Sequence, residues 1–160
     1  MIRKALYAGS FDPLTNGHLN IIERASRIAE SVTVGILINH SKKALLTLEE
    51  RMDIISHATE SLGNVKIECF EGLLADYVNN NGFDAVVRGL RATADFEYEI
   101  QMAQMNARLF TGHTETIFLM TDPKYSFISS SLIKEVVSLG GSVDGLLPEY
   151  ANQIIKSKLK

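Results

Sequence analysis

Short apolar runs alternate along the chain with longer stretches in which apolar residues recur at helical spacing. The short runs predict five strands, over residues 5–8, 32–38, 65–70, 84–87 and 115–120. The longer stretches predict six helices, over residues 17–30, 48–61, 72–81, 94–110, 129–139 and 148–158. Strands that alternate with helices pair in parallel through right-handed crossovers, so we expect an α/β fold with a doubly wound five-stranded sheet.

Composition supports one globular domain and excludes several classes of protein. Neither a repeat nor a linker interrupts the 160 residues, so we expect a single domain over 1–160. A net charge of −3 argues against a general nucleic-acid or membrane-surface binder, although it permits a local basic pocket. Cys69 is the only cysteine, which rules out an intrachain disulfide and a thiolate zinc cluster. With no secretory signal and no apolar run of membrane-spanning length, we expect a soluble cytoplasmic protein.

The segment Gly9–His18 (GSFDPLTNGH) joins the first predicted strand to a helix. Its spacing differs from the GxGxxG of dinucleotide-binding folds and from the P-loop. Small residues before a helix nevertheless let a phosphate approach the backbone amides at the helix N-terminus. His18 would lie in the first turn, where the helix dipole lowers its pKa, and it could donate a hydrogen bond to a phosphoryl oxygen. A tight turn followed by a surface histidine is the alternative interpretation.

The segment Arg88–Arg91 (RGLR) follows directly on the fourth predicted strand. We expect Gly89 to allow a sharp turn beside a ligand, and the two arginines to present guanidinium groups to phosphates or carboxylates. The placement at a strand end makes the alternative, an ion pair within the chain, the weaker prediction. The acidic residues considered for such a pair are Asp95, Glu97 and Glu99.

Two further segments follow strands and point to anions. Lys42 and Lys43 lie in the loop after the second strand, where solvated lysines are the simpler interpretation. The serines Ser129–Ser131 enter a helix, and their hydroxyls and free amides together suit a polyphosphate, whereas an N-cap needs only one serine. The other histidines lack metal-ligand spacing, so no protein metal site is expected. Together these segments predict a site for more than one phosphate at one edge of the sheet.

The sequence also resembles a known family. Gly9–His18 is similar to the T/HxGH signature of the nucleotidyltransferase superfamily, and Ile128–Ser131 to its ISSS element. The fuller pattern, from Ala5 to about Pro148, resembles the bacterial phosphopantetheine adenylyltransferase family. Ser10 stands where many members have Thr, and Thr15 where the wider superfamily often has His. The additional markers are Ser41–Lys43, Thr47–Arg51, Arg88–Arg91, Asp95–Glu99 and Ser126–Ser131.

This resemblance implies a Rossmann-like nucleotidyltransferase fold and an activity. The family transfers the adenylyl group of ATP to 4′-phosphopantetheine, which gives dephospho-coenzyme A and pyrophosphate. It implies Mg²⁺ held mainly by the ATP phosphates, coenzyme A as a feedback ligand, and a homohexamer.

The resemblance also assigns roles to individual residues. His18 is expected to stabilise the transition state. The residues expected to bind phosphopantetheine are Ser10, Lys42, Leu74 and Arg88. Those expected to bind ATP are Ser10, Phe11, His18, Gly89, Leu90, Arg91, Glu99, Tyr125, Ser126, Phe127, Ile128, Ser129, Ser130 and Ser131.

Two alternatives remain open at this point. One is a related nucleotidyltransferase with nicotinate mononucleotide or glycerol phosphate as acceptor, against which the Lys42 loop and Arg88–Arg91 argue. The other is a non-catalytic sensor of nucleotide or coenzyme A. The presence of both His18 and the three serines argues against the sensor.

Overall fold

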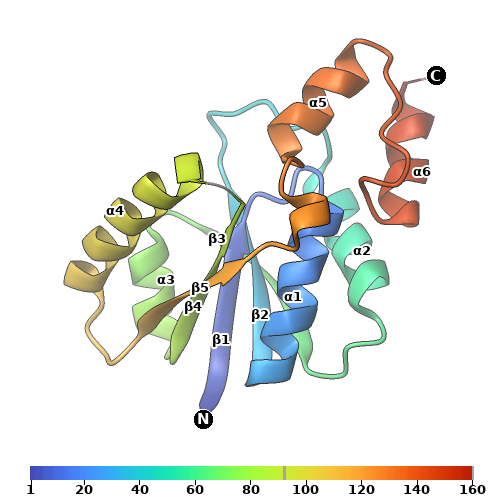
Figure 1. The fold of residues 1–160 in the computed structure, drawn as a ribbon. Helices are drawn as coiled ribbons and strands as arrows, with labels where there is room; N and C mark the ends of the chain where they lie inside the picture. Colours follow the sequence, from blue (N-terminus) through green and yellow to red (C-terminus); the bar gives the residue numbers. More distant parts are fainter. Residues whose placement is uncertain (92, 160) are drawn as a thin grey trace.

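A computed structural model describes residues 1–91 and 93–159. Its centre is a five-stranded sheet in the order β3-β2-β1-β4-β5 (Figure 1). Every neighbouring pair of strands is parallel, which confirms the predicted α/β fold. The strands are β1 (Ile2–Gly9), β2 (Ala29–Ile38), β3 (Val65–Glu71), β4 (Ala85–Leu90) and β5 (Glu115–Met120).

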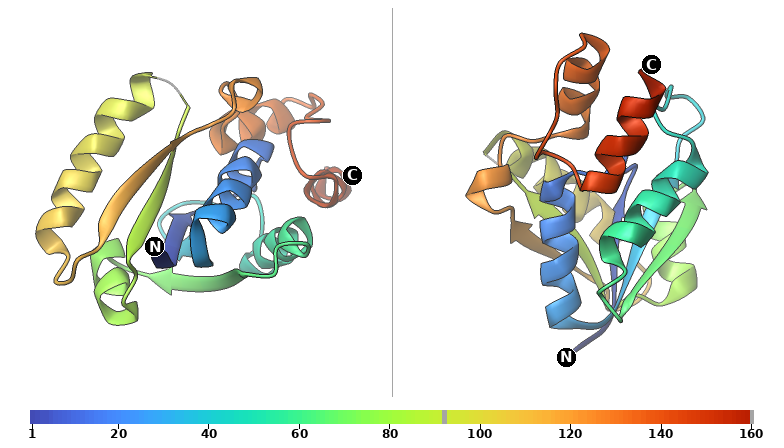
Figure 2. Two further views of the ribbon diagram at one scale, coloured as in Figure 1. Left: turned by 60° about the horizontal axis from the view of Figure 1, so that its bottom comes forward. Right: turned by 90° about the vertical axis from the view of Figure 1, so that its right-hand side faces the viewer.

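Helices cover both faces of this sheet. The α1, α2, α5 and α6 helices lie on one side and α3 and α4 on the other, as Figure 2 shows. Alternate residues of β1 serve the two faces: Ala5 and Tyr7 belong to the larger apolar core, and Leu6 and Ala8 to the smaller one. The helices are α1 (Asn16–Ile28), α2 (Leu48–Thr59), α3 (Leu74–Asn81), α4 (Thr93–Leu109), α5 (Ser130–Ser138) and α6 (Glu149–Lys158).

Several strands and helices begin or end at other residues than the sequence predicts. β1 extends to Ile2, which pairs with Ala29, so β2 starts where the first helix was expected to continue. β4 runs to Leu90 instead of ending at residue 87, because Arg88–Leu90 pair with β5. The predicted turn at Gly89 is therefore wrong. A Cβ at this position would lie 3.1 Å from Cγ1 of buried Ile21, so a larger residue there would require Ile21 to shift by a few tenths of an ångström.

The chain reverses its direction of travel across the sheet between β1 and β4. From β1 it proceeds outward through β2 to β3, and it then returns to the other side of β1 to form β4 and β5. Open α/β sheets bind ligands at the carboxyl ends of the strands at such a switch point. In the part of the chain that the structure describes, no helix has the length and apolar character needed to cross a membrane.

Candidate active site

The loop after β1 brings His18 to the switch point through a capping box. Thr15 is the N-cap of α1, and its Oγ1 accepts a hydrogen bond from the His18 amide at 3.2 Å. The Thr15 amide in turn donates to Nδ1 of His18 at 3.1 Å. Because Nδ1 accepts, the neutral imidazole carries its proton on Nε2. Thr15 thus serves the helix cap, and His18 presents a donor to the cavity.

The imidazole of His18 is held neutral. Burial, together with the nearby charges of Arg91 and Arg88, lowers its pKa from 6.5 to about 4. The sequence predicts the direction of this shift from the helix dipole, whereas burial is the main cause. A neutral ring can donate one hydrogen bond to an anion without a change of protonation.

Both arginines of the RGLR segment are paired with carboxylates of α4, so the ion pairs that the sequence made the weaker prediction are present. Arg88 Nε and Nη2 donate to Glu99 at 2.7 and 2.8 Å. Arg91 Nε and Nη2 donate to Asp95 at 2.9 and 3.0 Å. Each arginine also binds a backbone carbonyl, Arg88 that of Ala8 and Arg91 that of Ile128. These contacts fix both guanidinium groups at the carboxyl edge of the sheet.

The three serines make different contacts at the start of α5. Ser129 is the N-cap, and its Oγ accepts from the Leu132 amide at 3.0 Å. Ser130 Oγ donates to the carbonyl of Pro13 at 2.9 Å, which ties α5 to the loop after β1. The first helical bond runs from the Ile133 amide to Ser129 O. The amides of Ser130 and Ser131 precede it and have no partner inside the helix.

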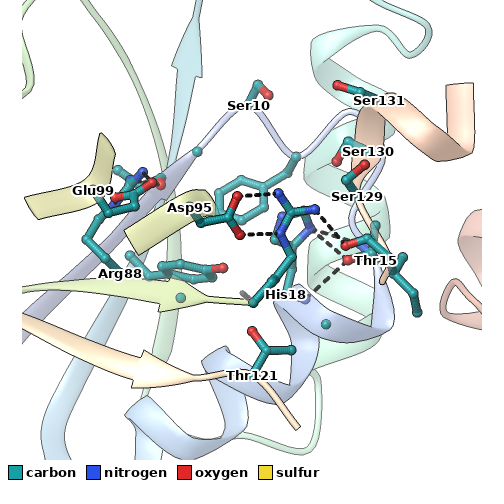
Figure 3. A pocket seen from close by; sticks show the side chains of 18 residues that line it. Ser10, Thr15, His18, Arg88, Asp95, Glu99, Thr121, Ser129, Ser130 and Ser131 are labelled. Carbon is teal, nitrogen blue, oxygen red and sulfur yellow. Dashed lines mark hydrogen bonds and ion pairs between the residues drawn. The ribbon is translucent and has the colours of Figure 1, made fainter. Parts of the chain in front are cut away.

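These segments enclose a cavity of about 350 Å³ at the carboxyl edge of the sheet (Figure 3). In the close-up, His18 and the three serines lie across the cavity from Arg88 and Glu99. Its lining residues are Tyr7, Ala8, Gly9, Ser10, Phe11, Thr15, Gly17, His18, Arg88, Gly89, Arg91, Asp95, Glu99, Thr121, Ile128, Ser129, Ser130 and Ser131.

A second cavity of about 230 Å³ adjoins the first on the α4 side. Ala8, Gly9, Arg88 and Glu99 line both cavities, so the Arg88–Glu99 pair stands at their boundary. The rest of the lining is mostly apolar, with Asn106 as a buried amide. Its other residues are Leu37, Phe70, Leu74, Val86, Tyr98, Met102, Ala103 and Thr116.

Most residues expected from the sequence converge on these two cavities. Leu74 lines the second, and most of the residues expected to bind ATP line the first. Lys42 is exposed on the loop after β2 and lines neither cavity. The others that line neither are Leu90, Tyr125, Ser126 and Phe127.

Sequence reasoning gave no individual role to Tyr7 or Asp12 near the site, and it considered Asp95 only as one of three possible ion-pair partners of the arginines. Tyr7 lines the first cavity, and burial raises the pKa of its phenol, so that the phenol stays protonated. Asp95 holds Arg91, and its i,i+4 spacing from that arginine was the available signal. The side chain of Asp12 is a carboxylate only 5% exposed in a loop of small and apolar residues. An acidic residue in such a loop was the signal that it has a fixed partner.

The site offers hydrogen-bond donors for phosphates and few ligands for a metal. The donors are a neutral imidazole, two guanidinium groups and the start of a helix. Among residues 1–91 and 93–159, no group of three or more His, Cys, Asp or Glu side chains is placed to hold a metal ion. The two carboxylates on the first cavity, Asp95 and Glu99, are each bound by an arginine. The arrangement can bind and orient phosphate groups.

Comparisons with known proteins agree with this geometry. Residues 6–136 match the family model described as cytidylyltransferase-like. The chain is therefore a member of the cytidylyltransferase-like nucleotidyltransferases. It is 51% identical over 155 residues to the phosphopantetheine adenylyltransferase of Clostridium novyi, covering 97% of this chain and 94% of that one. It is 48% identical over 159 residues to that of Streptomyces coelicolor, covering 99% of each. Within its class, the chain belongs to the phosphopantetheine adenylyltransferase family.

Proposed function

We propose that this protein transfers the adenylyl group of ATP to 4′-phosphopantetheine and forms dephospho-coenzyme A and pyrophosphate. The observation that carries the proposal is the pair of adjoining cavities that share Arg88 and Glu99. A polar cavity beside an apolar one fits a polyphosphate donor beside an acceptor with one phosphate and a long, weakly polar arm. The activity named for the relatives is the same. A related transferase with another acceptor is not favoured.

The first cavity is assigned to ATP. The free amides at the start of α5 and the Arg91 guanidinium are suited to the β- and γ-phosphates. The Nε2–H of His18 is suited to an oxygen of the α-phosphate, where charge develops during transfer. The residues proposed for ATP are Ser10, Phe11, His18, Gly89, Leu90, Arg91, Glu99 and 125–131, of which Leu90 and 125–127 lie outside the cavity lining.

The second cavity is assigned to the pantetheine arm. Apolar side chains such as Leu74 and Met102 suit the hydrocarbon parts of the arm, and the Asn106 amide suits its peptide-like groups. Arg88 at the boundary would bind the phosphate end and direct it toward the first cavity. Ser10 lines only the first cavity and follows Gly9, which lines both.

The chemistry requires positioning more than proton transfer. The acceptor phosphate is largely dianionic near neutral pH, since its second pKa is about 6, so no general base is needed. One of its oxygens attacks the α-phosphorus of ATP. The bond from that phosphorus to the bridging oxygen breaks, and its electrons leave with pyrophosphate. Holding the two anions in line and stabilising the developing charge provide nearly all of the rate enhancement.

The residues present fit an Mg²⁺ ion held mainly by phosphates and water. Mg²⁺ commonly keeps several waters and binds proteins through one or two carboxylates plus substrate phosphates. Asp95 and Glu99 lie on the first cavity, but their arginine partners occupy their oxygens. The ion would neutralise charge on the triphosphate. His18, Arg88 and Arg91 supply the protein's share of that stabilisation.

Lys42 requires a change of position to take part. Its side chain is exposed on the loop of residues 39–46, which follows β2 at the same edge of the sheet. A flexible ammonium group there can turn inward onto an acceptor phosphate. We expect Lys42→Ala to weaken phosphopantetheine binding about tenfold, and the neighbouring Lys43→Ala to have little effect. Calorimetry with phosphopantetheine alone tests this, and equal affinities for both variants would contradict it.

A homohexamer and feedback by coenzyme A are proposed from the resemblance to the family. The α4 helix exposes a group of large apolar side chains, which suits contacts between copies in a homohexamer. Coenzyme A would compete for the same two cavities, because it contains both a nucleotide and a pantetheine arm. The cytoplasmic location also stays a prediction. The exposed apolar residues of α4 are Phe96, Tyr98, Met102, Met105 and Leu109.

An acceptor panel with α-labelled ATP tests the proposed function. We expect label in dephospho-coenzyme A with phosphopantetheine, and kcat/KM at least about 100-fold lower with nicotinate mononucleotide or glycerol phosphate. An equal or higher kcat/KM with another acceptor would contradict phosphopantetheine as the substrate. Binding of both substrates without pyrophosphate release would support the sensor instead.

A further inference from the structure

A buried carboxylate joins three segments around the site without lining either cavity. Asp12 follows β1, and its side chain is 5% exposed. Its Oδ2 accepts from the Leu45 amide at 2.9 Å, and its Oδ1 from the Leu46 amide at 2.8 Å. Lys134 of α5 reaches Oδ2 at 3.4 Å. An ionised carboxylate can satisfy all three donors, because it only accepts hydrogen bonds and has two oxygens.

These bonds fix the end of the loop that carries Lys42. Leu46 is 1% exposed and Leu45 packs against the larger core, so the loop is anchored at both residues by packing and by Asp12. Lys42 lies only three residues before this anchor. The position of Asp12 therefore determines how far the Lys42 side chain can reach toward the boundary between the two cavities.

The contact with Lys134 connects Asp12 to α5, the helix that begins at the cavity assigned to ATP. Lys134 lies one turn after Ser130 on α5, the helix that begins at the first cavity. Ser130 Oγ donates to the carbonyl of Pro13, the residue next to Asp12. The start of α5 is thus bonded to Pro13, and the end of the Lys42 loop to the preceding residue, Asp12.

We propose that Asp12 is a positioning residue that places the Lys42 loop against the nucleotide-binding helix, so that the acceptor phosphate is held in line with ATP. The role of Lys42 in this statement rests on the proposed function. Asp12 acts through the loop amides and Lys134 and does not touch either substrate. Its replacement should therefore affect use of the acceptor more than use of ATP.

Asp12→Asn is the direct test, because an amide oxygen can accept from one loop amide while its NH₂ group opposes the other. We expect the KM for phosphopantetheine to rise about tenfold, as for loss of a charge-assisted hydrogen bond. The KM for ATP should stay within about twofold of wild type. In a Lys42→Ala background, Asp12→Asn should add less than about a further twofold, because the two residues act on one interaction.

Asp84→Asn is a matched control. Asp84 also accepts from two consecutive backbone amides, those of Arg3 and Lys4, each at 2.9 Å, and also pairs with a cation. It directly precedes β4 and so lies at the amino ends of the strands, away from both cavities. Its replacement should lower stability but leave both KM values unchanged. Equal changes of acceptor KM in the two variants would overturn the proposal, as would full additivity with Lys42→Ala.

Limited trypsin digestion provides a readout that does not depend on activity. Lys42 and Lys43 are cleavage sites in the loop, and we expect Asp12→Asn to accelerate cleavage there while Asp84→Asn does not. An unchanged rate would overturn the proposal even if the wild type is an adenylyltransferase. Faster cleavage in a protein that fails to transfer adenylate would support the anchor and reject the function. If Asp12→Asn does not fold, Lys134→Met should give the same pattern with smaller changes, and wild-type behaviour would overturn the proposal.

Discussion

Arg88 and Glu99 form a bidentate ion pair at the boundary of the two cavities, with N–O distances of 2.7 and 2.8 Å. Burial alone would lower the pKa of Arg88, but the hydrogen bonds and charge of Glu99 raise it above its ordinary value. The guanidinium group is thus held charged where an acceptor phosphate would bind. A phosphate that enters the site must either share the Arg88 guanidinium with Glu99 or displace the Glu99 carboxylate from it.

Glu99→Gln should destabilise the protein without ligand and increase its response to the acceptor. Removing one charge from a partly buried pair leaves the other uncompensated, so we expect unfolding to become about 1–3 kcal/mol easier. Phosphopantetheine should recover part of this loss, because its phosphate replaces the missing charge. Denaturation with and without phosphopantetheine measures both effects. Glu97→Gln, exposed on the same helix, is the control, and equal behaviour of the two variants would reject the role of the pair.

His18→Ala should reduce kcat about 10²- to 10³-fold, the effect of losing one preorganised donor at developing charge. The KM for each substrate should change much less, because the contact strengthens in the transition state. Steady-state kinetics checks this, with His113→Ala as an exposed control. A His18→Ala variant with wild-type kcat would show that the imidazole has no role in transfer.

The lowered pKa of His18 predicts a pH dependence of stability. Below pH 6.5 the unfolded imidazole binds a proton, whereas the folded one does not until about pH 4. The unfolded state therefore binds more protons in this window, and the free energy of unfolding falls as the pH falls. Because His18 keeps some exposure to the cavity, we expect a loss of about 1–3 kcal/mol.

The His18→Gln variant isolates this contribution. It lacks the titrating ring but retains a hydrogen-bonding side chain, and the other three histidines are present in both proteins. The difference in unfolding free energy between wild type and variant should shift in favour of the variant between pH 6.5 and 4. Parallel curves across this range would show that the histidine titrates normally in the folded protein.

Much of the fold was predictable because it depends on local pattern. Apolar runs located all five strands, and Thr47 with Glu50 three residues later, a local pattern typical of a helix start, forms a capping box on α2 with bonds of 3.2 and 2.8 Å. The extension of β4 through Arg88 and Gly89 was not predictable. Neither residue favours a strand, and pairing with β5 overrides that preference.

The donors of the candidate site were predictable, and Asp95 and Glu99 were among the acidic residues considered for the arginines, but the pairing itself and the partners of Asp12 were not predictable. His18 and Ser129–Ser131 are local features of helix starts, which a sequence shows directly. The partners of Arg88 and Asp12 come from α4, from the loop before α2 and from α5, so only the packed fold brings them together. The spacing of residues along the chain does not give the distances in space between these elements.

The stereochemistry at the α-phosphorus tests the central claim most directly. If the cavities hold the two substrates side by side and the acceptor phosphate attacks ATP without an intermediate, one in-line displacement occurs. A single diastereomer of ATP with sulfur on the α-phosphate should then give α-thio dephospho-coenzyme A with inverted configuration. Retention would mean two displacements through an adenylated residue of the protein, and it would contradict direct transfer between two bound anions.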